Sequence, residues 1–229
     1  CYKAGLCSFY GPSILAGFAE NGGIFPYTIE AIRKTLFSTD PVGVIPLNLD
    51  GWTVELLDWA DPSLQTRRRA LQPVTGWRWL QGAGCVEGHL IGGCFEVLDW
   101  LRGTPVWPDQ DAWHNAILFL ETSEEAPSPE YVTRVLRSFA AMGILDKLAA
   151  VLFGRPGGNV AAAEFSAYDQ AILHVITGEQ GLAHLPIVTN MDFGHTDPMC
   201  VLPYGVLAQV DCTRQQVAIL ESAVVEAAH

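Results

Sequence analysis

The clearest hydrophobic periodicity begins well inside the chain. Residues 77–82 (WRWLQG) and 86–92 (VEGHLIG) have the length and composition of two strands, and the Gly92–Gly93 pair is predicted to open a helix over 94–101. Residues 116–122 (AILFLET) form a continuous apolar run, which is typical of a strand buried on both faces. This part of the chain is therefore expected to form a sheet with a central, fully covered strand.

Helices and strands alternate in the remainder of the chain. Ser128 can cap a helix whose first residue is Pro129, and Gly143 fits the left-handed end of that helix. The further elements are predicted at 149–154 (strand), 164–177 (helix), 185–193 (strand) and 206–220 (hairpin). Strands and helices in rotation predict an α/β protein.

The first part of the chain has weaker signals. Residues 5–9 (GLCSF) predict a short buried strand, and a helix is predicted from Thr28, as its cap, to Phe37. Residues 38–76 contain a Trp-rich acidic stretch (DGWTVELLDWADP) without clear periodicity, which indicates a long connection between two units. The chain opens at Cys1 without a Met or a signal peptide, and we expect it to be part of a longer protein.

The composition of the chain argues against several classes of protein. The net charge of -12 disfavours nucleic-acid binding, and no apolar run approaches the ~20 residues that span a bilayer. The six cysteines include no C-x-x-C pair, so neither a zinc ribbon nor a disulfide framework is expected. Reduced thiols in the cytoplasm fit this pattern.

One loop carries the strongest candidate chemistry. His195 follows a predicted strand in the sequence DFGHTDP, and loops at strand ends are where α/β folds place reactive groups. A histidine base needs an orienting carboxylate, and Glu121 ends the apolar run at 116–122. Glu124 and Glu125 compete for that role, but they lie further into a polar loop and are expected to be solvated.

Other candidates have equally good structural explanations. Gly92 and Gly93 could present bare amides to a ligand at a helix start, but tight packing between elements explains them as well. Cys94 is expected to be a small buried residue, and Asp197 to cap local amides. A metal site and a cofactor are not expected, because the other histidines show no pattern of partners: His89, His114, His174, His184 and His229.

Four separated blocks together carry a family resemblance. GHLIGGCFEVL (88–98), AILFLETSEE (116–125), VLFGRPGG (151–158) and DFGHTDPMCVLPYG (192–205) resemble the LD-carboxypeptidases and the related microcin C immunity hydrolases, in the same order and spacing. That family hydrolyses amide bonds with a Ser-Glu-His triad. The resemblance implies that Glu121 and His195 are the catalytic acid and base.

The resemblance also shows a departure from the family pattern. The family's serine lies in a GYSD-type turn before a segment similar to YKAGLCSFYGP, and no GYSD occurs in these 229 residues. None of Ser8, Ser13 and Ser123 sits in a strand-turn-helix elbow, so no nucleophile is assigned. The resemblance implies three parts: the remnant of an N-terminal Rossmann-like nucleophile domain (1–45), a linker or insertion (46–75), and a C-terminal swivelling-type α/β domain (76–229).

The middle stretch bears on the substrate. It resembles the aromatic-rich insertion of the microcin C immunity proteins, in which a tryptophan stacks on the substrate's nucleobase, and Trp52 is the best-placed match. The alternative is a Trp52 that packs the insertion onto the body. The expected function is a cytoplasmic serine peptidase or amidase, a homodimer acting on a muropeptide or an aminoacyl-nucleotide. The alternative is an inactive fragment or pseudoenzyme that binds a small ligand.

Overall fold

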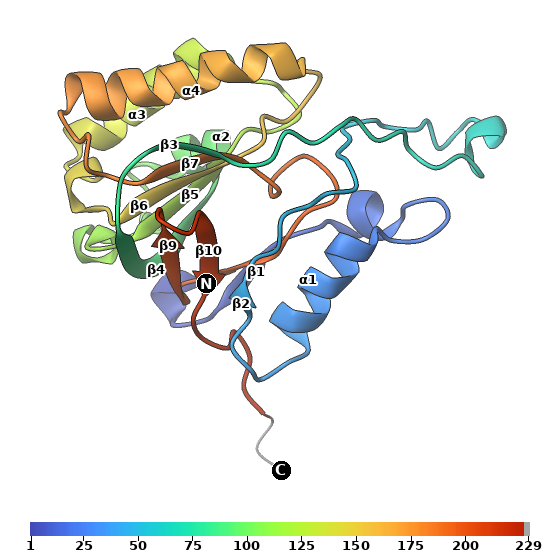
Figure 1. The fold of residues 1–229 in the computed structure, drawn as a ribbon, viewed down its shortest axis with the longest axis horizontal. Coiled ribbons are helices and arrows are strands. Elements are labelled where there is room, and N and C mark those ends of the chain that lie inside the picture. Colours follow the sequence, from blue (N-terminus) through green and yellow to red (C-terminus); the bar gives the residue numbers. More distant parts are fainter. Residues whose placement is uncertain (227–229) are drawn as a thin grey trace.

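An eight-stranded mixed sheet forms the centre of the structure, a computed structural model that describes residues 1–226 (Figure 1). Strands β4 to β7 run parallel, and the other neighbours are antiparallel. In spatial order the strands are β2 (Gly43–Val44), β10 (Gln216–Ile219), β9 (Leu207–Asp211), β4 (Cys85–Cys94), β5 (Ile117–Glu121), β6 (Ala150–Gly154), β7 (Ile187–Met191) and β3 (Arg78–Gln81).

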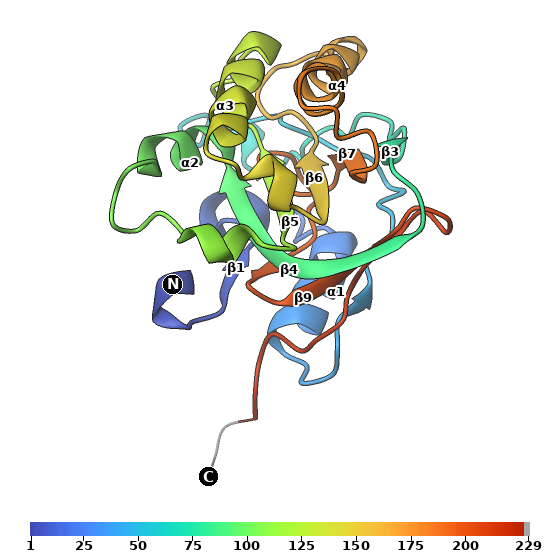
Figure 2. The ribbon, with the colours of Figure 1, turned by 90° about the vertical axis from the view of Figure 1, so that its left-hand side faces the viewer.

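The long strand β4 joins the two halves of this sheet. Its first five residues pair with β9 in antiparallel fashion and its last five pair with β5 in parallel, and Figure 2 shows its pronounced curvature. β5 lies between β4 and β6 and every residue of it is buried, which confirms the predicted central strand. Its carboxyl end carries Glu121.

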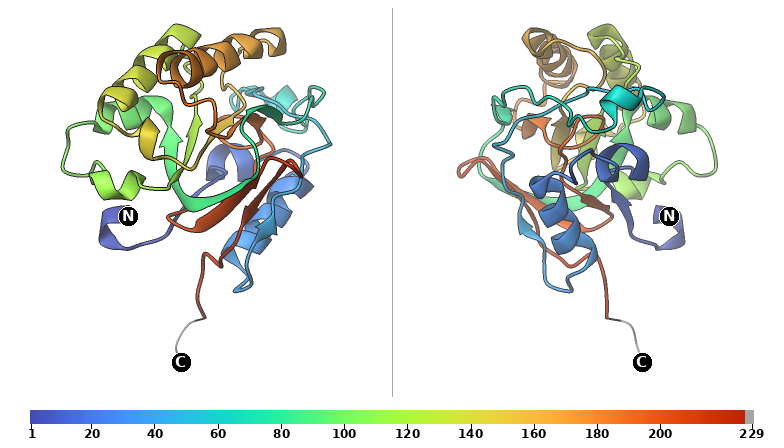
Figure 3. Two further views of the ribbon diagram at one scale, coloured as in Figure 1. Left: turned by 60° about the vertical axis from the view of Figure 1, so that its left-hand side comes forward. Right: turned by 90° about the vertical axis from the view of Figure 1, so that its right-hand side faces the viewer.

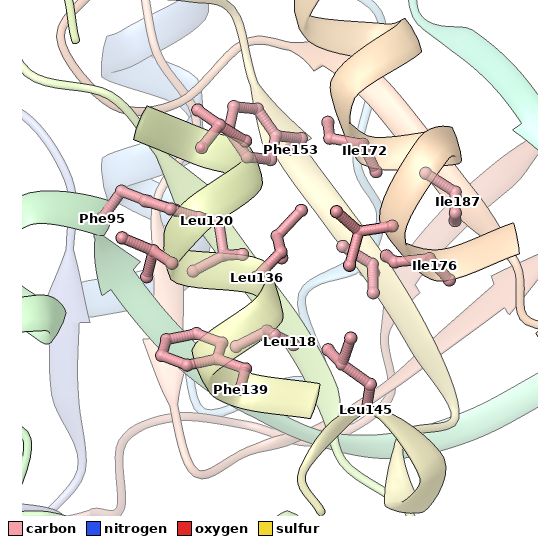
Figure 4. Packing of buried hydrophobic residues seen from close by; sticks show 14 of the residues in the cluster. Phe95, Leu118, Leu120, Leu136, Phe139, Leu145, Phe153, Ile172, Ile176 and Ile187 are labelled. Carbon is pink, nitrogen blue, oxygen red and sulfur yellow. The ribbon is translucent and has the colours of Figure 1, made fainter. Parts of the chain in front are cut away.

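Helices α3 (Pro129–Ala141) and α4 (Phe165–Leu173) lie side by side on one face of the sheet (Figure 1). In Figure 4, Leu136 and Phe139 of α3 point toward Leu118 and Leu120 of β5. Each such side chain contributes about 1.5–3 kcal/mol by leaving water. The predicted start of α3 is confirmed, because the Ser128 Oγ accepts a hydrogen bond from the Tyr131 N–H at 3.3 Å.

A second apolar cluster lies on the opposite face of the sheet. It joins Phe119 of β5 and Leu152 of β6 to Phe193 in the loop after β7. Tyr27 and Ala31 of helix α1 (Pro26–Leu36) pack against this cluster. Figure 3 accordingly shows α1 on the side of the molecule away from α3 and α4.

The first strand and the first helix differ from the sequence prediction. β1 (Ser8–Tyr10) pairs with β8 (Leu202–Tyr204) in a separate two-stranded sheet, and Leu6 before it is exposed, so the predicted buried strand at 5–9 is wrong. Thr28 does not cap α1, because Pro26 occupies the first turn, where a missing N–H costs nothing. Its hydroxyl instead donates to the Met199 carbonyl at 3.2 Å.

The Gly92–Gly93 pair lies inside β4, and helix α2 (Phe95–Leu101) begins only after Cys94. A Cβ on Gly92 would stand 1.7 Å from the Phe119 carbonyl oxygen, so a bare backbone is required for β4 to approach β5. The helix predicted over 94–101 is therefore confirmed to within one residue, and close packing accounts for Gly92. Binding of a ligand by the amides of Gly92 and Gly93 stays a prediction.

Most of the remaining elements agree with the sequence prediction. The terminal hairpin is confirmed as β9 and β10, and the helix predicted at 164–177 appears as α4 with a π-helical continuation. Residues 46–75 form an extended loop whose middle part projects from the body (Figure 1). The connections contain 3-10 helices at Tyr2–Ala4, Pro62–Leu64, Gln110–Trp113, Leu145–Lys147 and Ala162–Glu164, and π-helical turns at Ile14–Phe18 and His174–Glu179.

The predicted three-part division stays a prediction, although strands of the first part enter the sheets of the last, as the pairings of β1 and β2 show. None of the described helices is both long and apolar enough to cross a membrane.

Candidate active site

Glu121 and His195, 74 residues apart, meet at the carboxyl edge of the parallel strands. The Nδ1 of His195 lies 2.7 Å from Oε2 of Glu121. The backbone N–H of His195 donates to the same oxygen at 3.1 Å. Glu121 is fully buried, whereas the His195 side chain is 38% exposed. The arrangement is that of a histidine whose inner nitrogen is held by a buried carboxylate and whose outer nitrogen, Nε2, points away from it.

The loop approaches Glu121 closely because two glycines permit it. Gly194 has φ +102°, and a Cβ there would lie 2.6 Å from Oε2 of Glu121. A Cβ on Gly157, in the loop after β6, would lie 2.9 Å from that of His195. Glycine at these positions therefore brings the His195 backbone into hydrogen-bonding distance of the carboxylate.

The electrostatic surroundings favour the charged form of the imidazole. The hydrogen bond to Glu121 is the main cause that raises the pKa of His195 above its ordinary value, and burial opposes it. The charges of Glu124 and Glu96 act in the same direction as that of Glu121. His195 is thus surrounded by carboxylates, as a histidine that must accept a proton requires.

Glu124 differs from its predicted role as a solvated turn residue. Its side chain is 65% exposed, but its Oε2 lies 3.1 Å from Nε2 of His195. The loop after β5 bends back toward the histidine because Ser123 is tied down: its hydroxyl donates to Oε1 of the buried Glu96 at 2.5 Å. The Glu124 carboxylate therefore contacts Nε2, the ring nitrogen of His195 that faces away from Glu121.

A buried ion pair anchors the start of the His195 loop. Arg155, in the loop after β6, donates to Oδ1 of Asp192 at 2.7 Å, and both side chains are almost fully buried. The indole N–H of Trp77 donates to the other oxygen of Asp192 at 2.8 Å. Arg155 also contacts the hydroxyl of Thr196 at 3.3 Å. The pair thus holds both flanks of His195.

A second buried ion network anchors the end of that loop. Arg69 of the insertion lies 2.9 Å from Oδ2 of Asp197 and 2.5 Å from Oε2 of Glu20, and all three side chains are buried. Burial raises the pKa of Asp197, and the charge of Arg69 opposes the rise. Asp197 therefore makes a long-range ion pair, where the sequence indicated a local cap. Its backbone also pairs with Thr53, at 2.7 and 3.0 Å.

Trp52 is a core residue. Only 2% of it is exposed, it packs against Phe165 of α4, and its indole N–H donates to the Pro73 carbonyl. The guanidinium of Arg155 lies 5.1 Å from its ring centroid. Because the ring is enclosed, the predicted stacking of Trp52 on a nucleobase is wrong, and its alternative role of packing the insertion onto the body is the one observed.

A cavity of about 780 Å³ lies between the π-helical turn Ile14–Phe18 and the insertion. Apolar and polar side chains line it in equal number, Trp59 of the insertion is one of the apolar ones, and 65% of Trp59 is exposed. Glu20 and Arg69 also line it, so the network that reaches Asp197 forms part of its wall. Trp59 was not among the predicted site residues, although it lies in the same aromatic stretch as Trp52.

The other candidate groups show no chemistry of their own. Burial raises the pKa of the Cys94 thiol to about 12, and its Sγ donates to Glu96, so it is not a ready nucleophile. His89, His114, His174 and His184 are exposed, and His229 lies outside the described residues. Among residues 1–226, no group of three or more His, Cys, Asp or Glu side chains is arranged to hold a metal ion.

Comparison with known proteins agrees with this geometry. The family model described as the LD-carboxypeptidase C-terminal domain matches residues 87–210, which include β4, Glu121 and His195. This chain belongs to that family.

Similar proteins include a microcin self-immunity protein and solved structures related to it. The microcin C7 self-immunity protein MccF of Escherichia coli is 26% identical over 220 residues, covering 96% of this chain and 60% of MccF. An MccF-like protein from Streptococcus pneumoniae, solved in complex with AMP, is 28% identical with a TM-score of 0.81, covering 95% of this chain and 64% of that one. A tryptophan-to-phenylalanine variant of MccF, solved with adenosine monophosphate, is 26% identical with a TM-score of 0.79, covering 97% and 63%.

The chain spans about three-fifths of the length of the curated relatives it matches. The structural likeness confirms the predicted α/β fold.

Proposed function

We propose that this chain provides the acid and the base of a serine-type hydrolase that cleaves an amide bond in a small substrate. The observation that carries the proposal is the contact of His195 Nδ1 with the buried Glu121 carboxylate. In this proposal Nε2 of His195 takes the proton of a serine hydroxyl as the serine attacks the carbonyl carbon, and later gives it to the leaving amine. Glu121 holds the ring and stabilises the imidazolium.

The serine is proposed to come from outside residues 1–229. Among the described residues, the side chain on Nε2 of His195 is that of Glu124, and no serine, threonine or cysteine bonds to this nitrogen. The Glu124 side chain is largely exposed and can move away without losing buried contacts. In the proposed mechanism the serine hydroxyl replaces the Glu124 carboxylate on Nε2.

An aminoacyl-nucleotide is the substrate that the surface near the site favours over a muropeptide. The cavity beside the insertion has a volume in the range of small-molecule sites, about 300–1,000 Å³. Its exposed Trp59 offers an aromatic face to a nucleobase. The relatives solved with AMP support the same substrate class.

The test uses the protein expressed from the complete open reading frame. It is assayed for cleavage of an aminoacyl adenylate analogue with a non-hydrolysable phosphate mimic, and for release of D-alanine from a muramoyl tetrapeptide. We expect turnover of the first substrate. Turnover of the second alone would reassign the substrate to peptidoglycan fragments. Binding of AMP without turnover of either would indicate a non-catalytic binding module and overturn the proposal.

A further inference from the structure

Tyr10 forms a hydrogen bond with the carboxylate that holds the proposed base. It is the last residue of β1, and its hydroxyl donates to Oε1 of Glu121. Its ring packs against Phe119 of β5, with 5.5 Å between the ring centroids. The strand that carries Glu121 therefore also holds the ring of the residue that binds it.

The contacts of Glu121 are divided between its two oxygens. Oε2 accepts both hydrogen bonds from His195, and Oε1 accepts the one from Tyr10. A fully buried carboxylate is costly unless donors satisfy it, and its torsion is broad unless contacts fix it. Without Tyr10, the described residues offer Oε1 no other side-chain donor.

We propose that Tyr10 is a positioning residue for the hydrolase: its hydroxyl fixes the Glu121 carboxylate so that Oε2 faces the Nδ1 of His195. The expected loss of turnover rests on the proposed function. The expected change in the pKa of His195 rests on the observed contacts alone.

The charge distribution makes this role measurable. Burial, followed by the charge of Glu121, raises the pKa of Tyr10, so its hydroxyl stays a donor. That donor holds the carboxylate in the orientation in which Oε2 faces the imidazole. The other groups facing this pair are Glu96, Glu124, Cys94 and Asp197, and a change at Tyr10 leaves them in place. Loss of the hydroxyl therefore lets the carboxylate turn and weakens the hydrogen bond that raises the pKa of His195.

The experiment is Tyr10→Phe, with Tyr27→Phe as the matched control. The Tyr27 hydroxyl donates to the Pro46 carbonyl, away from Glu121, so the control removes a hydrogen-bonding hydroxyl without touching the pair. NMR titration of the 229-residue chain should show the pKa of His195 lowered by about 0.3–1 unit in Tyr10→Phe and unchanged in Tyr27→Phe. In the protein from the complete reading frame, kcat should fall about tenfold with KM nearly unchanged.

A second measurement covers the case in which Tyr10→Phe fails to fold. With ¹³Cζ-labelled tyrosine, Glu121→Gln should shift the Tyr10 resonance and leave that of Tyr27 in place. An unchanged or raised His195 pKa in a folded Tyr10→Phe, or an unmoved Tyr10 resonance in Glu121→Gln, overturns the inference. The titration needs no turnover, so a protein without hydrolase activity but with a shifted His195 would refute the proposed function and leave the positioning contact standing.

Discussion

Glu121 accepts two hydrogen bonds from His195 on a single oxygen, one from the ring at 2.7 Å and one from the backbone at 3.1 Å. The first fixes the rotation of the imidazole and the second fixes the loop that carries it. A histidine bound only through its ring could move with its loop. Here the backbone hydrogen bond also fixes the loop to Glu121 at the end of β5. The position of the proposed base therefore depends on both hydrogen bonds.

The pKa of His195 should depend on its carboxylate neighbours in a fixed order. Since Glu121 is the main cause of the raised pKa and Glu124 a smaller one, Glu121→Gln should lower it most and Glu124→Gln less. Glu125→Gln is the control, since Glu125 is not among the groups that shift His195. NMR titration of the ring checks the order, and an equal response to all three substitutions would contradict it.

The raised pKa of His195 sets the direction in which turnover and stability change with pH. A base must be neutral to act, so turnover should rise with pH through the raised pKa, and this limb should move to lower pH in Glu121→Gln. For stability, a raised pKa means that the contribution of the charged pair is complete below the unfolded value of about 6.5 and is lost as pH rises through the folded value. Kinetic profiles and urea unfolding across that window measure both.

Gly194→Ala should be far more damaging than an alanine at another left-handed glycine. At Gly194 the new Cβ meets Glu121, whereas at Gly181, with φ +71°, nothing lies within 4 Å. Gly181→Ala should cost about 1 kcal/mol for the backbone alone, and Gly194→Ala about 3 kcal/mol or more. Urea unfolding of both variants gives the comparison, and equal losses would show that the loop does not press on Glu121.

The Arg69 network should be structurally important, in contrast to its neighbour. Arg69→Met leaves the buried Asp197 without its cation and Glu20 with only the more distant Arg68, at 4.0 Å, and should cost about 3–5 kcal/mol. Arg67→Met breaks an exposed pair with Glu55 and should cost at most about 1 kcal/mol. Thermal and urea unfolding of the two variants test this, and a small loss in Arg69→Met would mean that the network does not anchor the loop.

Trp59 should contribute to nucleotide affinity. Loss of a stacked base is worth about 1–3 kcal/mol, so Trp59→Ala should weaken AMP binding about 5- to 150-fold. Trp100→Ala is the control, because Trp100 is similarly exposed but lies on α2, outside the residues that line the cavity. Calorimetric titration with AMP decides, and equal affinities in the wild type and Trp59→Ala would remove Trp59 from the site.

Local sequence patterns were sufficient for the central sheet, the helix after Ser128 and the terminal hairpin, because periodicity and capping chemistry act over a few residues. The pairing of Glu121 with His195 was also predictable: both end or follow buried strands, and parallel strands bring their carboxyl ends to one edge. The expected homodimer, the cytoplasmic location and the domain boundaries stay predictions.

The residues whose roles were not predicted correctly have contact partners far away in the sequence. Gly92 was predicted to begin a helix because the neighbouring sequence does not show the Phe119 carbonyl, which leaves no room for a side chain there. Trp52 looked available for stacking because Phe165, which covers it, lies more than 100 residues later. Tyr10 and Arg69 act entirely through such contacts, at Glu121 and Asp197, so no local pattern could identify them.

The most direct test of a His195 base held by Glu121 is the turnover of the aminoacyl adenylate analogue by the protein from the complete reading frame. We predict that His195→Ala and Glu121→Gln each reduce kcat by about a thousandfold or more, and that the double variant is little worse than either, because the two residues act as one unit. His184→Ala, an exposed histidine elsewhere, should keep wild-type turnover. Near-normal turnover in either single variant, with the protein folded, would contradict the account.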